Sequence, residues 1–166
     1  GENPLPPDNT KHNCTHGKSQ EDICNESPQF LDLIGDDKPE LLAYSHGQIT
    51  LALPNSDPNK PWQVLPISAK DKRFHKYAHG LGAGDINGDR LPDILEKAGW
   101  WQQPENWDRK SPWTFHPYPF APQQGGAQMF AYDIDGDGDN DVVTALNAHA
   151  YGLAWYEQVK DGDKIT

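Results

Sequence analysis

The amino-acid sequence predicts an all-β protein built from repeated units, and two observations lead to this prediction. The first is composition: the 166 residues include 15 Gly and 15 Pro, 35% are hydrophobic, and the mean hydropathy is −0.86. Such a chain has little helix-forming material and no apolar run near the roughly 18 residues of a membrane span. The second is a nine-residue acidic pattern that occurs three times, at residues 32–40, 85–93 and 133–141.

The three copies of this pattern align residue by residue, and their first residues lie 53 and 48 residues apart. Two aliphatic residues follow each copy. Self-similarity at such a period is typical of repeat architectures, in which each repeat is one supersecondary unit.

Each acidic pattern is followed by two short apolar runs with a turn between them. The runs are residues 40–44 and 48–53, then 93–97 and 100–102, then 141–146 and 153–158. Short runs separated by Gly, Asn or Ser turns predict β-hairpins. A Trp-led strand follows in the first two repeats, at 62–67 and 113–118, and another strand is expected before each acidic pattern.

Four antiparallel strands in about 50 residues predict a β-propeller blade. The expected blades are about 27–68, 74–120 and 125–166, and the last lacks its outermost strand. Propellers close with about four to eight blades. The remaining blades are therefore expected from a longer parent chain or from other subunits.

The acidic pattern itself predicts calcium binding. It places oxygen ligands at positions one, three, five and nine, a backbone carbonyl at position seven and a Gly at position four, which suits the six to eight oxygen ligands of Ca²⁺. Two sites are expected. The ligands of the third copy are Asp133, Asp135, Asp137, the backbone carbonyl of Asp139, and Asp141, and those of the second copy are Asp85, Asn87, Asp89, the backbone carbonyl of Leu91, and Asp93.

The first copy is eroded, because Ile34 occupies position three and Glu40 position nine. We expect it to form a structural turn rather than a third Ca²⁺ site at Asp32 and Asp36. An EF-hand is the competing interpretation of the second copy, with Glu96 at position twelve. It is disfavoured because an EF-hand requires Gly at position six, where this copy has Arg90.

Residues 1–26 precede the repeats and contain both cysteines, Cys14 and Cys24. We interpret them as a disulfide, which places the protein in a secreted, periplasmic or cell-surface compartment. A zinc site formed by His12, Cys14, His16 and Cys24 is the alternative. The net charge of −11 argues against nucleic-acid partners, and no membrane span is expected.

With these motifs in view, the chain resembles the VCBS/FG-GAP-like repeat family, the bacterial relatives of the integrin alpha-subunit propeller. In that family, Asp-x-Asp/Asn-Gly-Asp loops join the first and second strands of each blade. The resemblance runs from about Phe30 to Gln158 and implies the propeller fold and the calcium loops. It implies little about activity, because one fold hosts many functions.

Antiparallel strands alternate direction, so the hairpin turns and the starts of the first strands must lie on the face opposite the acidic loops. We expect that face to bind a carbohydrate or a protein partner. The predicted ligand-binding residues are His46, Trp100, Trp101, Gln128, His149 and Tyr151, with His75, His79, Gly125 and Gly126 nearby. Aromatic and His side chains beside glycines suit sugars or a His-bound metal.

The alternative function is a sugar lyase. Segments 99–104 and 148–152 are similar to the propeller part of aldos-2-ulose dehydratase-like sugar lyases. This resemblance implies a keto-sugar substrate and a divalent metal held by His residues. His79 or His149 would then be the base or a metal ligand, and Tyr151 a proton donor.

Overall fold

The computed structural model describes residues 26–75, 77–122, 125–161 and 164–165, with side chains described as far as residue 159. The predicted Cys14–Cys24 disulfide and its zinc alternative lie outside these ranges. The described residues form β-strands and no helix, which confirms the all-β prediction. Within them, no segment has the helical length and hydropathy needed to cross a membrane.

The strands form three antiparallel sheets and one separate hairpin. In all three sheets each strand pairs with its neighbour in sequence, so that in the third sheet β10 lies between β9 and β11. The first sheet contains β1 (Gln29–Leu31), β2 (Glu40–Ser45), β3 (Gln48–Leu53) and β4 (Gln63–Pro66). The second contains β5 (Leu81–Gly84), β6 (Asp93–Glu96), β7 (Gly99–Gln102) and β8 (Thr114–Pro117). The third contains β9 (Met129–Tyr132), β10 (Asp141–Ala145) and β11 (Leu153–Tyr156), and the separate hairpin pairs β12 (Lys160–Asp161) with β13 (Lys164–Ile165).

The predicted hairpins are confirmed with small shifts at their ends. Ser45 pairs with Gln48 across a two-residue turn, and Glu96 pairs with Gly99 in the same way. The first turn has positive φ at both of its residues, His46 (51°) and Gly47 (78°), which short hairpins favour. The β12–β13 hairpin was not predicted, because two-residue strands are too short to show periodicity.

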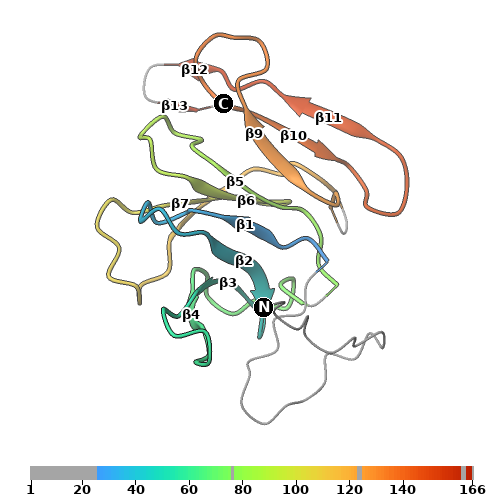
Figure 1. The fold of residues 1–166 in the computed structure, drawn as a ribbon. Coiled ribbons are helices and arrows are strands. Elements are labelled where there is room, and N and C mark those ends of the chain that lie inside the picture. The colour runs from blue at the N-terminus through green and yellow to red at the C-terminus, as the bar shows by residue number, and fades with distance from the viewer. Residues whose placement is uncertain (1–25, 76, 123–124, 162–163, 166) are drawn as a thin grey trace, which may run out of the picture.

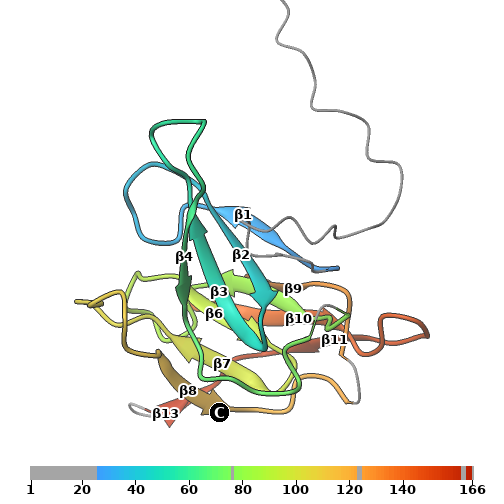
Figure 2. The same ribbon diagram turned by 90° about the horizontal axis from the view of Figure 1, so that it is seen from below.

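The three sheets are stacked face to face (Figure 1). Seen from below, strands β2 to β4 cross those of the second sheet at a steep angle (Figure 2). The described sheets do not close on themselves.

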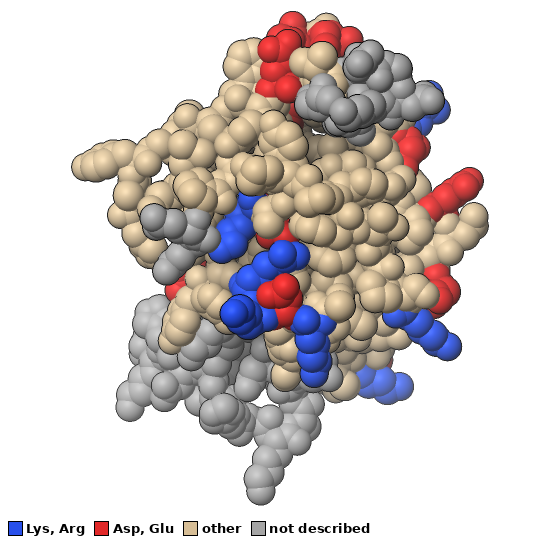
Figure 3. Space-filling model, turned by 180° about the vertical axis from the view of Figure 1, so that it is seen from behind, with Lys and Arg blue, Asp and Glu red and all other residues tan. Residues whose placement is uncertain are grey.

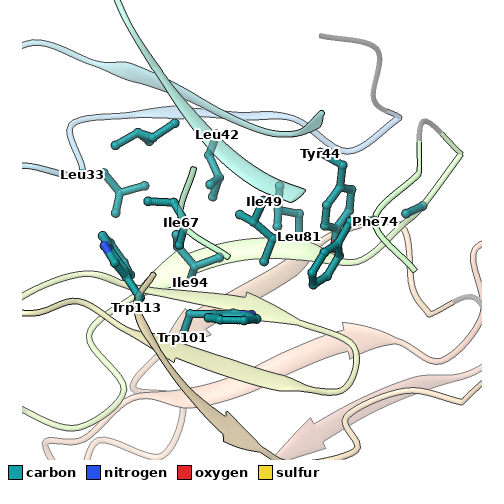
Figure 4. Close-up of a cluster of buried hydrophobic side chains, with 12 residues drawn as sticks. Leu33, Leu42, Tyr44, Ile49, Ile67, Phe74, Leu81, Ile94, Trp101 and Trp113 are labelled. Atoms are coloured by element: carbon teal, nitrogen blue, oxygen red, sulfur yellow. The ribbon is translucent and has the colours of Figure 1, made fainter. Parts of the chain in front are cut away.

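A large apolar core fills the space between the first and second sheets (Figure 4). The rings of Tyr44 and Phe74 stack at 5.4 Å, and Trp101 meets Phe74 edge-on at 6.3 Å. A smaller cluster around Leu95, Trp100 and Met129 fills the space between the second and third sheets. Burial of these side chains is the main force holding the sheets together.

Glycines allow β5 to lie directly against β9. A Cβ at Gly82 would come within 2.2 Å of the Met129 carbonyl oxygen, and one at Gly84 within 2.4 Å of the Ala131 Cβ. The two first strands are also joined by a parallel bridge between Leu81 and Gln128. Successive side chains of a strand point to opposite faces of its sheet. Every second side chain of β9 and β11 therefore points away from the second sheet.

The two ends of the stack expose large apolar side chains. On the outer face of the third sheet, Phe130, Tyr132 and Leu153 are 55%, 69% and 78% exposed. On the outer face of the first sheet, the rings of Phe30 and Trp62 stack on each other at 6.4 Å. Both ends therefore present sheet faces of the kind that is buried inside the stack.

The contact between β5 and β9 gives a direct test of sheet stacking. Gly82→Ala should lower the free energy of unfolding by about 3 kcal/mol or more, because its Cβ would overlap backbone that cannot move aside. Gly35→Ala is the matched control: it has a φ of +74° and open space around it, and should cost only about 1 kcal/mol. Urea denaturation of both variants measures the difference, and equal losses would contradict the close stacking.

Candidate functional site

The three acidic loops adopt one hydrogen-bonding arrangement. The carboxylate at position one accepts hydrogen bonds from the backbone N–H groups of positions four and six in every copy. In the second loop, Gly88 N–H and Arg90 N–H donate to Asp85 at 2.7 and 2.8 Å. The corresponding bonds are to Asp32 at 2.8 and 2.9 Å and to Asp133 at 2.7 and 3.1 Å. The first residue therefore fixes the turn of each loop.

Position nine supplies a buried carboxylate. Glu40, Asp93 and Asp141 are 1%, 0% and 1% exposed, although all three are acidic. Each accepts a hydrogen bond from the N–H of position two, at 2.8, 3.0 and 3.2 Å. Burial raises the pKa of Asp93 to about 7 and outweighs the hydrogen bonds from Gln103 and Ile86, which lower it. A nearby cation would favour its charged form.

Backbone conformation is also shared by the loops. Position four is a glycine with φ between 74° and 82° in each copy. Position six has positive φ even where it is not glycine, at Asp37 (63°) and Arg90 (71°). This left-handed residue is costly for a side chain and is maintained by the hydrogen bond to position one.

The first loop differs at position three, as its sequence predicts. In the other two loops the side-chain oxygen of Asn87 or Asp135 accepts the N–H of position five, at 2.9 and 3.1 Å. Ile34 has no such oxygen, and Asp36 N–H bonds to Asp32 instead at 3.1 Å. The loop keeps its shape because the bonds to positions one and nine are donated by backbone N–H groups, including that of Ile34, and do not need a side-chain oxygen at position three.

Two of the loops bring three carboxylates within ligand range. Ligand oxygens of Asp133, Asp135 and Asp137 lie within 4.8 Å of one another, and so do those of Asp32, Asp36 and Glu40. Acidic side chains gather at the upper end of Figure 3, where Figure 1 places the β9–β10 loop. Such a set of hard oxygen donors fits Ca²⁺. The first loop also keeps three carboxylates within this range, although it lacks the ligand oxygen at position three.

Glu96, which an EF-hand would use at position twelve, is engaged elsewhere. Its side chain is 1% exposed and lies 3.1 Å from the Arg73 guanidinium, and its carboxylate also accepts the N–H of Ala98. The flanking elements are strands and not helices. The structure therefore rejects the EF-hand interpretation.

The opposite ends of the strands form a second surface, which we call the histidine face. Three residues define it: Glu26 before β1, His79 before β5, and His149 in the β10–β11 turn. Figure 1 shows the acidic loops at the left and upper left and the β10–β11 turn at the right. Each of the three sheets contributes one of these residues.

The three side chains converge. His79 is 6% exposed, and its Nε2 lies 3.2 Å from a Glu26 carboxylate oxygen. The His149 ring stands nearly perpendicular to that of His79, with centroids 5.0 Å apart. One ligand atom from each of the three residues lies within 4.8 Å of the others.

The sequence pointed to both histidines but missed Glu26. A signal was present, because Glu26 and His79 both stand six residues before their acidic patterns. Aligning the repeats beyond the acidic loops would have placed them at the same register. The equivalent residue of the third repeat is Ala127.

The other predicted site residues lie outside this cluster. Tyr151 is 99% exposed, near His149 in the β10–β11 turn. His46 occupies the β2–β3 turn, where its Nδ1 lies 2.8 Å from the Ser45 hydroxyl. The backbone carbonyl of Gln128 accepts the Thr144 hydroxyl at 3.2 Å.

Trp100 and Trp101 do not form an exposed aromatic platform, which corrects their expected position. Each is 7% exposed, because successive residues of β7 face the two neighbouring sheets. Trp101 packs in the first core, and Trp100 stacks on His116 at 4.1 Å. Trp100 also lines a cavity of about 450 Å³ between the second and third sheets.

The chain matches no protein-family model, no curated protein and no solved structure.

Calcium binding at the third loop can be tested by chelation. Removing Ca²⁺ from loaded protein should lower the melting temperature by mass-action linkage, because the folded loop binds the ion and the unfolded chain does not. Asp137→Ala should reduce the calcium-dependent shift more than Asp36→Ala, because the third loop has a side-chain oxygen at position three and the first loop does not. Differential scanning calorimetry with and without chelator measures both effects. Identical melting in the two conditions would exclude a structural Ca²⁺ site.

Proposed function

We propose that this chain is part of a calcium-stabilised β-propeller that binds a carbohydrate on its histidine face. The observation that carries the proposal is the convergence of Glu26, His79 and His149, one from each sheet, at the end of the strands opposite the acidic loops. A calcium-stabilised, secreted, periplasmic or cell-surface binding protein is the class that best fits both surfaces.

The arrangement of the sheets supports propeller blades. The first two sheets share one strand order, and the third repeats its first three strands. The first strands β1, β5 and β9 approach one another in turn, as inner strands do around a propeller axis. All three acidic loops join a first strand to a second strand.

The exposed ends of the stack support additional blades. Leu42 and Tyr44 in the first sheet face the second, where they are buried. The equivalent face of the third sheet, which points away from the second sheet, carries exposed side chains such as Phe130 and Trp155. A further blade, from the parent chain or another subunit, would bury them and remove the open faces.

The chemistry of the histidine face favours a hydroxyl-rich ligand. Imidazole and carboxylate groups offer donors and acceptors, and the nearby Tyr151 ring is fully accessible to stacking. Sugars need both kinds of contact, because their hydroxyls bond to polar groups while their C–H faces pack on aromatic rings. A protein partner on this face is the other outcome that a binding test would reveal.

Carbohydrate binding should depend on Tyr151. In calcium-loaded protein, Tyr151→Ala should weaken binding to an oligosaccharide identified on a polysaccharide array by about tenfold, because it removes the stacking surface. Tyr132→Ala is the control, since Tyr132 is 69% exposed but lies on the outer face of the third sheet. Isothermal titration calorimetry measures both. Equal affinities in the wild type and Tyr151→Ala would contradict a carbohydrate site beside this residue.

A second candidate function is elimination of water from a keto-sugar, favoured by the buried His79 next to Glu26. A base would remove the proton beside the ketone. The resulting enolate would expel a hydroxyl group as water and leave an enone, with Tyr151 as the proposed donor of the proton to the leaving oxygen. His79 or His149 would serve as that base.

Turnover distinguishes the two functions. The lyase function predicts enone formation by the wild type, visible by ultraviolet absorbance, and a loss of about a hundredfold or more in His79→Gln and His149→Gln. The binding function predicts no turnover by the wild type and a modest change in sugar affinity in the same variants. His46→Gln is the matched control, because His46 lies outside the cluster.

A further inference from the structure

We propose that the carbohydrate bound at the histidine face is anionic, a chain of carboxylated or sulfated sugars, and that a basic surface beside that face recognises its charges; this inference rests on the proposed binding function. The basic surface consists of Lys70, Lys72, Arg73 and Lys97. The overall composition does not suggest such a ligand, because the net charge of the chain is −11.

The charges of the chain are divided between the two ends of the strands. The acidic loops carry their Asp residues at one end. At the opposite end, the basic surface is formed by residues 69–75, which lie between β4 and β5, and by the β6–β7 turn. Figure 3 shows Lys and Arg side chains gathered near the middle of the view and acidic ones at its upper end. A ligand at the histidine face therefore meets local positive charge, although the whole chain is negative.

Hydrogen bonds and burial hold the 69–75 segment in place. The Asp71 N–H donates to the Gly47 carbonyl at 2.8 Å, so the segment lies against the β2–β3 turn. The Asp71 side chain and carbonyl then accept the N–H groups of Arg73 and Phe74, at 2.9 and 3.1 Å. Phe74 is buried in the core between the first two sheets. The two lysines beside Asp71 are therefore presented from a fixed backbone.

Arg73 joins this segment to the second sheet. Its guanidinium lies 3.1 Å from the buried Glu96 carboxylate and packs over the Phe115 ring at 5.1 Å. Burial raises the pKa of Glu96, and the Ala98 N–H and the positive charges of Arg73 and Lys97 oppose that rise. Glu96 thus offsets the charge of Arg73, which acts as a positioning residue.

Lys97 borders the histidine face. A Cβ at Gly125 would lie 2.9 Å from the Lys97 Cβ and 3.5 Å from the His79 carbonyl oxygen, so Lys97 and His79 flank the same glycine. The Gly125 carbonyl also accepts the N–H of Ala148, next to His149, at 2.9 Å. The basic surface and the histidine face are therefore parts of one continuous surface.

The lysines of the 69–75 segment are available to an anionic ligand. Lys70 and Lys72 are exposed, and neither forms an ion pair with another described residue. Asp71, the acidic residue between them, lies 3.8 Å from the Arg73 guanidinium. Carboxylate or sulfate groups of a ligand would accept charge-assisted hydrogen bonds from the two ammonium groups.

The chain from the basic surface to His79 also carries rings suited to sugars. Tyr77 is 57% exposed, and its ring meets that of His75 edge-on at 6.4 Å. The Tyr77 N–H donates to His75 Nδ1 at 3.2 Å, which fixes the two residues relative to each other. Sugar C–H faces pack on exposed rings of this kind while polar groups bind the hydroxyls.

The small size of the basic surface favours an acidic polysaccharide over other polyanions. Such a polysaccharide spaces its charges one sugar ring or more apart, so a few lysines suffice to recognise it. Nucleic acids and anionic membranes present denser charge, which the remaining acidic surface of this chain repels.

The experiment titrates the full chain, loaded with Ca²⁺, with two pairs of probes by isothermal titration calorimetry. The pairs are oligogalacturonate with its carboxyl-reduced form and carrageenan oligosaccharides with their desulfated form, and they distinguish carboxylated from sulfated ligands. We expect at least one acidic probe to bind about tenfold or more tightly than its neutral counterpart. This preference should shrink as ionic strength rises, because the lysines are exposed.

A double variant tests the basic surface directly. Lys70→Gln with Lys72→Gln should weaken binding of the preferred acidic probe by about tenfold and leave binding of its neutral form unchanged. Lys60→Gln with Lys110→Gln is the control, since it removes the same charge from exposed lysines in the β3–β4 and β7–β8 loops, at the other ends of the strands. Equal melting temperatures of both double variants verify that they are folded.

Several outcomes would overturn the inference. These are equal affinity for the acidic and neutral members of both pairs, a preference that the Lys70→Gln/Lys72→Gln variant retains, or tighter binding of single-stranded DNA or phosphatidylserine vesicles than of either acidic probe. Binding of neutral sugar that depends on Tyr151 would leave the proposed function in place while this inference fails. Acidic-probe binding that depends on the two lysines but not on Tyr151 would support this inference and contradict the site beside Tyr151. Binding of no probe would overturn both.

Discussion

The structure depends on a buried carboxylate at the start of the second strand of each sheet. Glu40, Asp93 and Asp141 are almost fully enclosed, and a buried charge is costly unless hydrogen bonds or a cation compensate it. Each carboxylate accepts an N–H from the second residue of its loop, so it ties the loop to the strand that follows. This interaction fixes where the loop ends and holds its start beside the strand that follows.

The histidine face follows from that constraint. With the acidic loops at one end of the strands, the starts of the first strands and the β10–β11 turn must lie at the other. There the stacking of three sheets brings together Glu26, His79 and His149, and residues 125–127 bond to all three of their segments. The proposed calcium and carbohydrate sites therefore lie at opposite ends of the same strands, and a ligand bound at either end would stabilise the folded state that forms the other site.

Sequence reasoning was most successful where a single short pattern sets both structure and chemistry. The first loop shows its limit: the loss of an oxygen at Ile34 was visible, but the retained geometry was not, because the bonds to Asp32 and Glu40 do not require a side-chain oxygen at position three. Trp100 and Trp101 show a second limit. Their position beside a turn was predicted correctly, but their burial depends on both neighbouring sheets, which the residues of β7 face alternately.

The sequence by itself determined the all-β class, the hairpins and the acidic loops. These depend on interactions between residues less than about a dozen positions apart, so turn residues and short apolar runs suffice to predict them. Only the tertiary structure decided that Glu26 joins His79 and His149, and that Gly82 allows β5 to touch β9. Those contacts join residues far apart in the chain, and they exist because apolar burial stacks the sheets in one order. No local pattern encodes the distance between two stacked sheets.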